Sequence, residues 1–250
     1  MRCFVISVLY IVASLFGAMA ENRAYEVEAF TKLDVSRGVK LIFTSGEPQS
    51  IIAESTNGDF ERLIVEVKGD TLIVSRHIKG MTWRAGEAHH YTVTITAPKL
   101  DDIKAASGSY VTAKDLFEPG LSLTANSGAK LAARNVTSSK LYLSSTSGAK
   151  LIAENIEAET VKASVGYGAY FEAEGTCEYL KDKSTSGSTM DASQLQCAHF
   201  SGSVNSGGFI EGYARETVQS EAYSGGKIRL EGGAQSLQNK QYTGGDIKVE

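Results

Sequence analysis

Proline, tryptophan and cysteine are scarce in this chain of 250 residues, which holds three prolines, one tryptophan and three cysteines. No linker of low complexity interrupts it, so the sequence does not predict a string of separate domains. Charge is not concentrated either. The formal net charge is −4, and no run of like charge is long enough to predict binding to nucleic acid or to an anionic membrane.

Long apolar runs are absent except at the N-terminus, where residues 1–20 have the pattern of a signal peptide. Arg2 gives a positive start, residues 4–16 are mostly apolar, and Ala18-Met19-Ala20 has the small-x-small pattern of a cleavage site. A membrane anchor is the alternative, but the run is too short for a span and lacks a charged stop. We therefore predict export to the periplasm, the cell surface or the medium, with no membrane span after cleavage.

The rest of the chain is dominated by a repeat of about twenty residues. Each repeat carries a small or polar residue, or a tyrosine, followed by glycine, and successive glycines are 18 to 20 residues apart. A fixed period of this size indicates stacked structural repeats. The pairs are Ser107-Gly108, Ser127-Gly128, Ser147-Gly148, Tyr167-Gly168, Ser186-Gly187, Ser206-Gly207, Ser224-Gly225 and Thr243-Gly244.

Apolar residues recur at fixed places in each repeat and alternate with polar ones. This period of two predicts strands with one buried face. Three residues after the glycines stand Val111, Leu131, Leu151, Phe171, Met190, Ile210, Ile228 and Ile247. Seven residues before them stand Asp101, Leu121, Leu141, Val161, Leu180, Phe200, Val218 and Leu237, which we expect to point inward in all but the first repeat.

The repeat length is shared by leucine-rich repeats, but their signature and their helical segment are missing. The sequence therefore predicts an all-β solenoid whose coils stack in parallel about 4.8 Å apart. We assign residues 101–250 to regular coils. Residues 21–100 alternate less cleanly, and we expect them to form a β-rich N-terminal part that is a cap or a set of irregular first coils.

The longest stretch without a strand pattern is 79–90, which contains Trp83 and the pair His89-His90. It could be a binding loop or a metal site, or a plain surface loop. Adjacent histidines on a strand point to opposite faces, and no third ligand is spaced nearby. We therefore predict no metal site.

Three stretches before the coils carry a family resemblance. They are Phe-x-x-Leu-x-Val at 30–35, Gly-Asp-Thr-Leu-Ile-Val at 69–74, and Val-Thr-Ile-Thr-Ala-Pro-x-Leu-x-x-Ile at 93–103. Over roughly residues 30–240 the chain resembles the putative auto-transporter adhesin, head GIN domain family, a group of secreted bacterial proteins. The resemblance implies a right-handed parallel β-helix and an envelope or extracellular setting, and it brings no catalytic residues.

Catalytic signatures are missing as well. The chain has no nucleophile elbow with a Ser-His-Asp order, no phosphate loop and no zinc-ligand spacing, so we predict no catalytic, cofactor-binding or metal-binding residues. An alternative is a polysaccharide-active enzyme, because Glu172, Asp191 and Glu211 share one outward column, which Arg229 and Lys248 continue. We favour the interpretation of these acids as a solvated strand face.

Aromatic residues give the candidate binding face. Tyr110, Tyr170 and Phe209 share the outward column two residues after the glycines, and Tyr167 lies at a turn. Such rings suit sugars or protein partners, although they could also serve only to stiffen the wall. We predict an adhesin-like binding or structural protein without catalysis, whose partner is a glycan or an envelope protein. A self-assembling envelope protein is a further alternative.

The two cysteines outside residues 1–20 are Cys177 and Cys197, one repeat apart. On neighbouring coils their Cα atoms would lie within the range that a disulfide tolerates, and an exported chain reaches compartments where disulfides persist. Buried free thiols that behave as small apolar side chains are the alternative. The sequence leaves both open.

Overall fold

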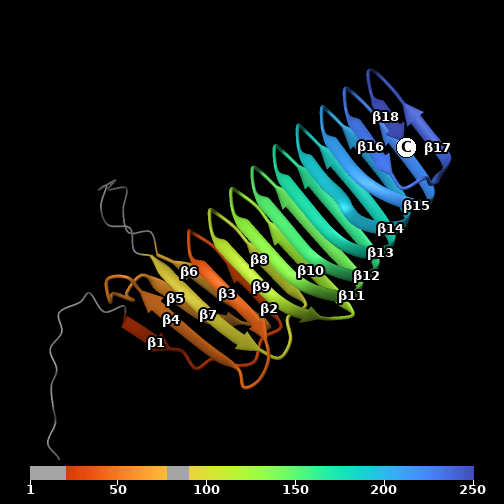
Figure 1. Ribbon diagram of the computed structural model, residues 1–250. Coiled ribbons are helices and arrows are strands. Elements are labelled where there is room, and N and C mark those ends of the chain that lie inside the picture. Colours follow the sequence, from red (N-terminus) through yellow and green to blue (C-terminus); the bar gives the residue numbers. More distant parts are fainter. Residues whose placement is uncertain (1–20, 78–89) are drawn as a thin grey trace, which may run out of the picture.

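The computed structural model describes residues 21–77 and 90–250, and this part of the chain is a stack of β-coils (Figure 1). Strands make up 71% of it, no helix is present in the described residues, and the coils of about twenty residues complete about 7 turns. The predicted all-β solenoid is therefore confirmed. The signal peptide predicted at 1–20 and residues 79–89 of the predicted loop lie outside the described residues. The described residues contain no helix long and apolar enough to cross a membrane.

The strands fall into two groups. The first precedes the long coils and comprises β1 (Glu21–Ala24), β2 (Lys32–Val35), β3 (Lys40–Ser45), β4 (Ser50–Ser55), β5 (Leu63–Lys68), β6 (Thr71–Arg76), β7 (Tyr91–Ala97), β8 (Asp102–Ala105), β9 (Tyr110–Phe117) and β10 (Gly120–Ala125). The second comprises β11 (Lys130–Thr146), β12 (Lys150–Gly166), β13 (Tyr170–Thr185), β14 (Thr189–Asn205), β15 (Phe209–Ala222), β16 (Lys227–Glu231), β17 (Gln235–Gln241) and β18 (Asp246–Val249).

A single long strand such as β11 makes most of a coil because it bends in the middle. Asn135 has a φ of 58°, in the left-handed region that asparagine tolerates better than most residues. The bend lets residues on both halves of the strand, such as Leu131 and Leu143, face one interior. Asparagines also stack here. Asn155 donates to Asn135 at 3.0 Å, and Asn135 donates to Asp115 at 2.7 Å.

The Ser-Gly pairs close the coils. Ser147 and Gly148 have φ values of 55° and 68°, two successive left-handed residues that a glycine makes easier to form. The turns are also bonded to one another along the axis. The Gly128 N–H donates to the Ser147 carbonyl at 3.1 Å, and the Gly148 N–H donates to that of Tyr167 at 3.1 Å. The repeated glycine therefore belongs to a continuous ladder of turns.

The core consists of apolar columns that run along the axis. In β11 and β12, Leu131 pairs with Leu151 and Leu141 pairs with Val161. The column three residues after the glycines is buried in every coil, as the sequence predicts. The other predicted column fails in the last coil, where Leu237 is 54% exposed. The pairing of β15 with β17 shifts by one residue after Val218, and such a shift turns a side chain to the other face.

Residues 32–45 already form a coil in the register of the later ones. Lys32 in β2 pairs with Asp102 in β8, and Lys40 in β3 pairs with Tyr110 in β9. On the other side of this coil lie β6 and β7, which are also parallel to β2 and β3. β4 and β5 then pair with β7 and β6 in the antiparallel sense. The coil formed by β2 and β3 is thus inserted between segments that follow it in the sequence.

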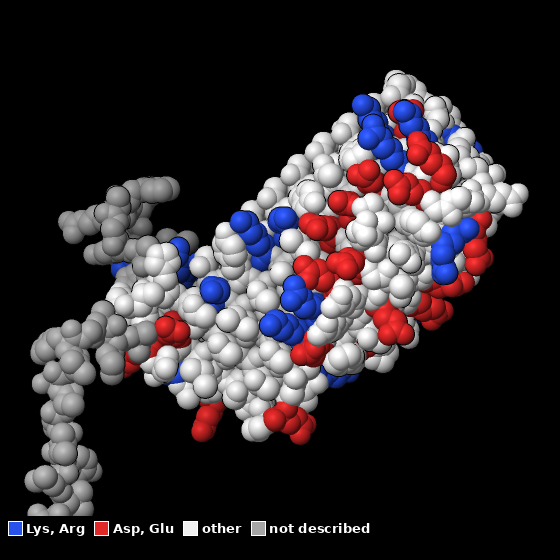
Figure 2. Space-filling model, viewed as in Figure 1, with Lys and Arg blue, Asp and Glu red and all other residues white. Residues whose placement is uncertain are grey.

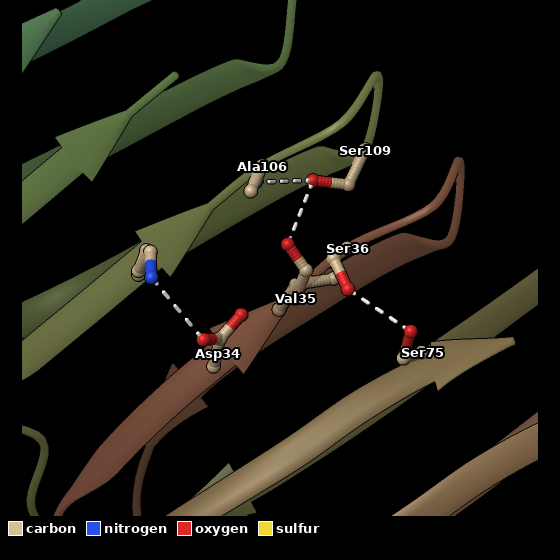
Figure 3. A network of polar contacts seen from close by, with 7 residues as sticks. Asp34, Val35, Ser36, Ser75, Ala106 and Ser109 are labelled. Carbon is tan, nitrogen blue, oxygen red and sulfur yellow. Dashed lines mark hydrogen bonds and ion pairs between the residues drawn. The ribbon is translucent and has the colours of Figure 1, made fainter. Parts of the chain in front are cut away.

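Polar contacts join these coils (Figure 3). The Ser109 hydroxyl donates to the Val35 carbonyl at 3.0 Å and accepts from the Ala106 N–H at 3.0 Å. On the other side, the Ser36 and Ser75 hydroxyls are 2.9 Å apart. Because Ser109 is fully buried, its two hydrogen bonds remove the cost of placing a hydroxyl in the core.

Candidate functional site

Three of the predicted binding residues, Tyr110, Tyr170 and Phe209, lie on one surface, which we call the Tyr110 face, and Tyr167 lies on the turn between β12 and β13. This face is formed by the outward side chains of β3, β7, the first halves of β9 and of β11–β15, β16 and β18. The central column of this face follows the strand pairings. In axial order from β3 it reads Lys40, Tyr110, Lys130, Lys150, Tyr170, Thr189, Phe209, Lys227 and Asp246.

The aromatic rings of this column are separated by other residues. Tyr110 is 49% exposed and Tyr167, on a neighbouring turn, is 69% exposed, whereas Tyr170 and Phe209 are partly buried. Three coils separate Tyr110 from Tyr170, which is about 14 Å along the axis. Two coils, or about 10 Å, separate Tyr170 from Phe209. The face is therefore a spaced series of rings rather than one aromatic platform.

Each ring of the column is covered in part by a cation from a neighbouring coil. Lys130 Nζ lies 5.0 Å from the centre of the Tyr110 ring, and Lys150 Nζ lies 4.7 Å from that of Tyr170. The Arg229 guanidinium lies 5.6 Å from the Phe209 ring. At these distances the cation is attracted to the face of the ring. The rings are held in place, and each presents its remaining surface next to a positive charge.

Tyr170 is also bound through its hydroxyl, which donates to Glu172 at 3.3 Å. Lys150 approaches the same carboxylate at 3.9 Å. Partial burial is the main cause that raises the pKa of Tyr170, and the nearby carboxylates of Glu172 and Asp191 raise it further. Tyr170 therefore stays neutral at physiological pH and can act as a hydrogen-bond donor.

Acidic residues occupy the next column. Glu172, Asp191 and Glu211 pair in successive strands, and Arg229 and Lys248 follow them. Glu211 and the two cations line a hollow of about 230 Å³ near the β18 end. Across the visible side of the molecule, basic and acidic side chains gather in alternating groups (Figure 2). The column therefore changes from acidic to basic side chains towards β18.

Neighbouring coils are also joined covalently. Cys177 in β13 and Cys197 in β14 are paired in register and joined by a disulfide, with 2.02 Å between the sulfurs and 4.5 Å between the Cα atoms. Both side chains are buried. In residues 21–77 and 90–250 no group of three or more histidine, cysteine and acidic side chains is placed to hold a metal ion.

Comparison with known proteins places this architecture in a family. The family described as putative auto-transporter adhesin, head GIN domain, matches residues 29–234. The chain belongs to this family. No curated protein matches the sequence.

Solved structures share the fold of this head GIN domain protein at low sequence identity. A putative lipid binding protein from Parabacteroides distasonis is 14% identical, with a TM-score of 0.80 over 92% of this chain and 96% of the other. A putative adhesin from the same species is 16% identical, with a TM-score of 0.80 over 93% and 98%. A putative adhesin from Parabacteroides merdae is 16% identical, with a TM-score of 0.80 over 92% and 95%.

Several exposed aromatic residues of this head GIN domain protein were not singled out from the sequence, among them Phe117 and Tyr142. Phe117 is 62% exposed at the edge of a hollow of about 560 Å³, and Tyr142 is 43% exposed on the second half of β11. Neither belongs to the column of Tyr110. A search for aromatic residues in every outward column, rather than in the column next to the glycines alone, would have found Tyr142.

Proposed function

We propose that this head GIN domain protein is an exported, non-catalytic, adhesin-like protein whose Tyr110 face contacts a glycan or an envelope protein. The observation that carries the proposal is the column of rings on a rigid parallel stack. Its rings recur about 10 and 14 Å apart, are fixed by neighbouring cations, and combine an apolar surface with polar neighbours. Membership of an adhesin-like family supports the same function.

A rigid β-wall suits adhesion because binding does not have to order the site. The contact residues are on strands rather than on loops, so little conformational entropy is lost when a partner binds. Repeated contacts along one axis also suit a partner that is itself repetitive, such as a glycan chain. Each contact can be weak while the sum is strong.

The test is a glycan array with the exported form of the protein, followed by titration of the bound glycan against variants. Tyr170→Ser combined with Phe209→Ser should weaken binding at least about tenfold, since both rings are lost. Phe117→Ser is the matched control, because it removes an exposed ring outside the face. Circular dichroism should be the same for all three proteins.

An unchanged affinity in the double variant would exclude the Tyr110 face as the binding surface. Turnover of a polysaccharide substrate would instead favour the enzyme alternative. Concentration-dependent sedimentation of the protein alone would favour self-assembly.

A further inference from the structure

A second surface of the molecule, the Tyr142 face, is independent of the candidate site. It is formed by the outward side chains of β8, β10, the second halves of β11–β15, and β17, across the core from the Tyr110 face. Two hollows lie on it, of about 220 Å³ and about 440 Å³. Lys162 and Ala163 line both hollows, so the two are adjacent. Together they form a shallow trough from β10 to β17, about 30 Å long at the usual strand spacing.

Three lysines gather in this trough. Lys162 in β12 pairs directly with Lys181 in β13, and Lys183 follows two residues later on the same face. All three are exposed, and within the described residues none of them forms an ion pair. On the same face Lys240, by contrast, lies 3.3 Å from Glu221. Like charges directly opposite one another in a sheet are destabilising, so a bound anion would relieve a repulsion that the fold leaves in place.

The acid closest in sequence does not neutralise the lysines. Asp182 lies between Lys181 and Lys183 but points into the core, where neither carboxylate oxygen has a hydrogen-bond partner of good geometry. Burial raises the pKa of Asp182 well above its usual value, and the Lys183 amide opposes this only in part. The carboxyl is therefore stabilised in its uncharged form. Asp182 therefore does not neutralise the positive charge of the lysines at the surface.

The remaining lining of the trough suits sugars. Hydroxyl and amide side chains dominate it: Ser122, Thr124, Ser144, Ser201, Gln219 and Gln238. Tyr142 adds an exposed ring, and Lys162 Nζ lies 5.2 Å from its centre. Such groups donate and accept hydrogen bonds with sugar hydroxyls, and an exposed ring packs against a sugar face. Three lysines on a chain of net charge −4 are too few for the extended basic surface that nucleic acid requires.

We propose that this lysine trough binds a linear acidic oligosaccharide. Its carboxylates contact Lys162, Lys181 and Lys183, and one of its sugar rings packs on Tyr142. The chain lies along the solenoid axis, because the trough runs in that direction. This site is separate from the Tyr110 face, and it would remain if that face proved to bind nothing.

The experiment is calorimetric titration of the exported protein with an oligogalacturonate of about six sugars, which matches the length of the trough. Lys162→Gln, Lys181→Gln and Lys183→Gln combined should weaken binding at least about tenfold. A control variant with the same change in charge carries Lys68→Gln, Lys99→Gln and Arg215→Gln, three exposed basic residues that line neither the trough nor the Tyr110 column. It should bind as the unmodified protein does.

Three further measurements sharpen the assignment. The methyl-esterified oligogalacturonate keeps the sugar chain but loses its charge, and it should not bind. Raising the salt concentration should weaken binding of the charged form, because the lysines are exposed. Tyr142→Ser should weaken binding a few-fold while leaving this salt dependence unchanged.

Three results would overturn the proposal. The first is no binding of the oligogalacturonate to the unmodified protein. The second is an equal loss in the trough variant and its control, which would show that only net charge matters. The third is tighter binding of single-stranded DNA or of phosphatidylglycerol vesicles than of the oligogalacturonate. The Tyr170→Ser and Phe209→Ser variant tests the Tyr110 face, so failures of the two proposals are distinguishable.

Discussion

At the scale of single residues, Gly175 shows how a shortened repeat is accommodated. Its coil has one residue fewer than the one before, and the pairing of β12 with β13 shifts between Ala153 and Ile156. In the earlier coil the strand bends at Asn155, which has a left-handed φ. In the shorter coil the corresponding bend is at Gly175, which has a φ of 138°. A Cβ at Gly175 would lie only 2.2 Å from the Ile156 carbonyl oxygen. Only glycine fits where the shorter coil draws the two backbones together.

Asp182 gives a prediction at the same scale. Its pKa is raised in the folded protein, so the folded state keeps this proton at pH values where the unfolded chain has lost it. Below about pH 4 both states are protonated and there is no cost. As the pH rises above that value, the free energy of unfolding should fall by about 1.4 kcal/mol per unit until the folded-state pKa is reached.

Asp182→Asn keeps the shape of the side chain and removes the titration. The variant should therefore be more stable than the unmodified protein at pH 7, and the difference should disappear towards pH 4. Urea unfolding at several pH values measures this. Glu159→Gln, which replaces an exposed acid, is the control. A difference that did not vary with pH would contradict a titrating Asp182.

At the scale of the coil, the columns make a second prediction. Leu151 is fully buried between Leu131 and Phe171, so Leu151→Ala should lower the free energy of unfolding by about 2–5 kcal/mol. Lys150→Ala removes only a partly exposed contact to Tyr170 and Glu172 and should cost less than about 1 kcal/mol. Thermal melting of both variants measures this difference in stability. Similar losses of stability in the two variants would mean that the side chains of Leu151 and Lys150 do not point to opposite faces of the strand.

The strands of the regular coils could be predicted because each apolar residue repeats a position that its neighbours also occupy. The turn at Arg37-Gly38 has the same left-handed pair, but 70 residues separate its glycine from Gly108, so no period reveals it. Leu237 was misplaced for the opposite reason, since the period continues while the pairing slips.

The site was predictable only in part. Outward columns follow from the period, so the common side of Tyr110, Tyr170 and Phe209 could be predicted. How far cations cover the rings depends on the rotamers of long side chains, which no period determines. The extent of the trough on the other face depends on which side chains are short enough to leave a hollow.

At the scale of the whole molecule, the disulfide joins two coils that already stack. Removing it with Cys177→Ala and Cys197→Ala should lower the free energy of unfolding by about 3 kcal/mol, because the unfolded chain loses a closed loop of 20 residues. The unmodified protein should lose a similar amount on reduction, as followed by its melting temperature. Exported protein alkylated without reduction should show no free thiol at either position, and alkylation of both would contradict the bridge.

The insertion of the β2–β3 coil between later segments determines when the chain can fold. β11 meets its partner β12 only 20 residues further on, whereas β2 meets β8 after 70. Closing the longer loop costs about 1 kcal/mol more in chain entropy. Synthesis begins at the N-terminus, yet the first coil to emerge has no neighbour until β6 and β7 have followed it. Its other side stays unpaired until residues near 117 have been made. The N-terminal end of the solenoid therefore cannot complete its strand pairing until later segments have been synthesised. Each later coil, by contrast, can pair at once with the coil made before it.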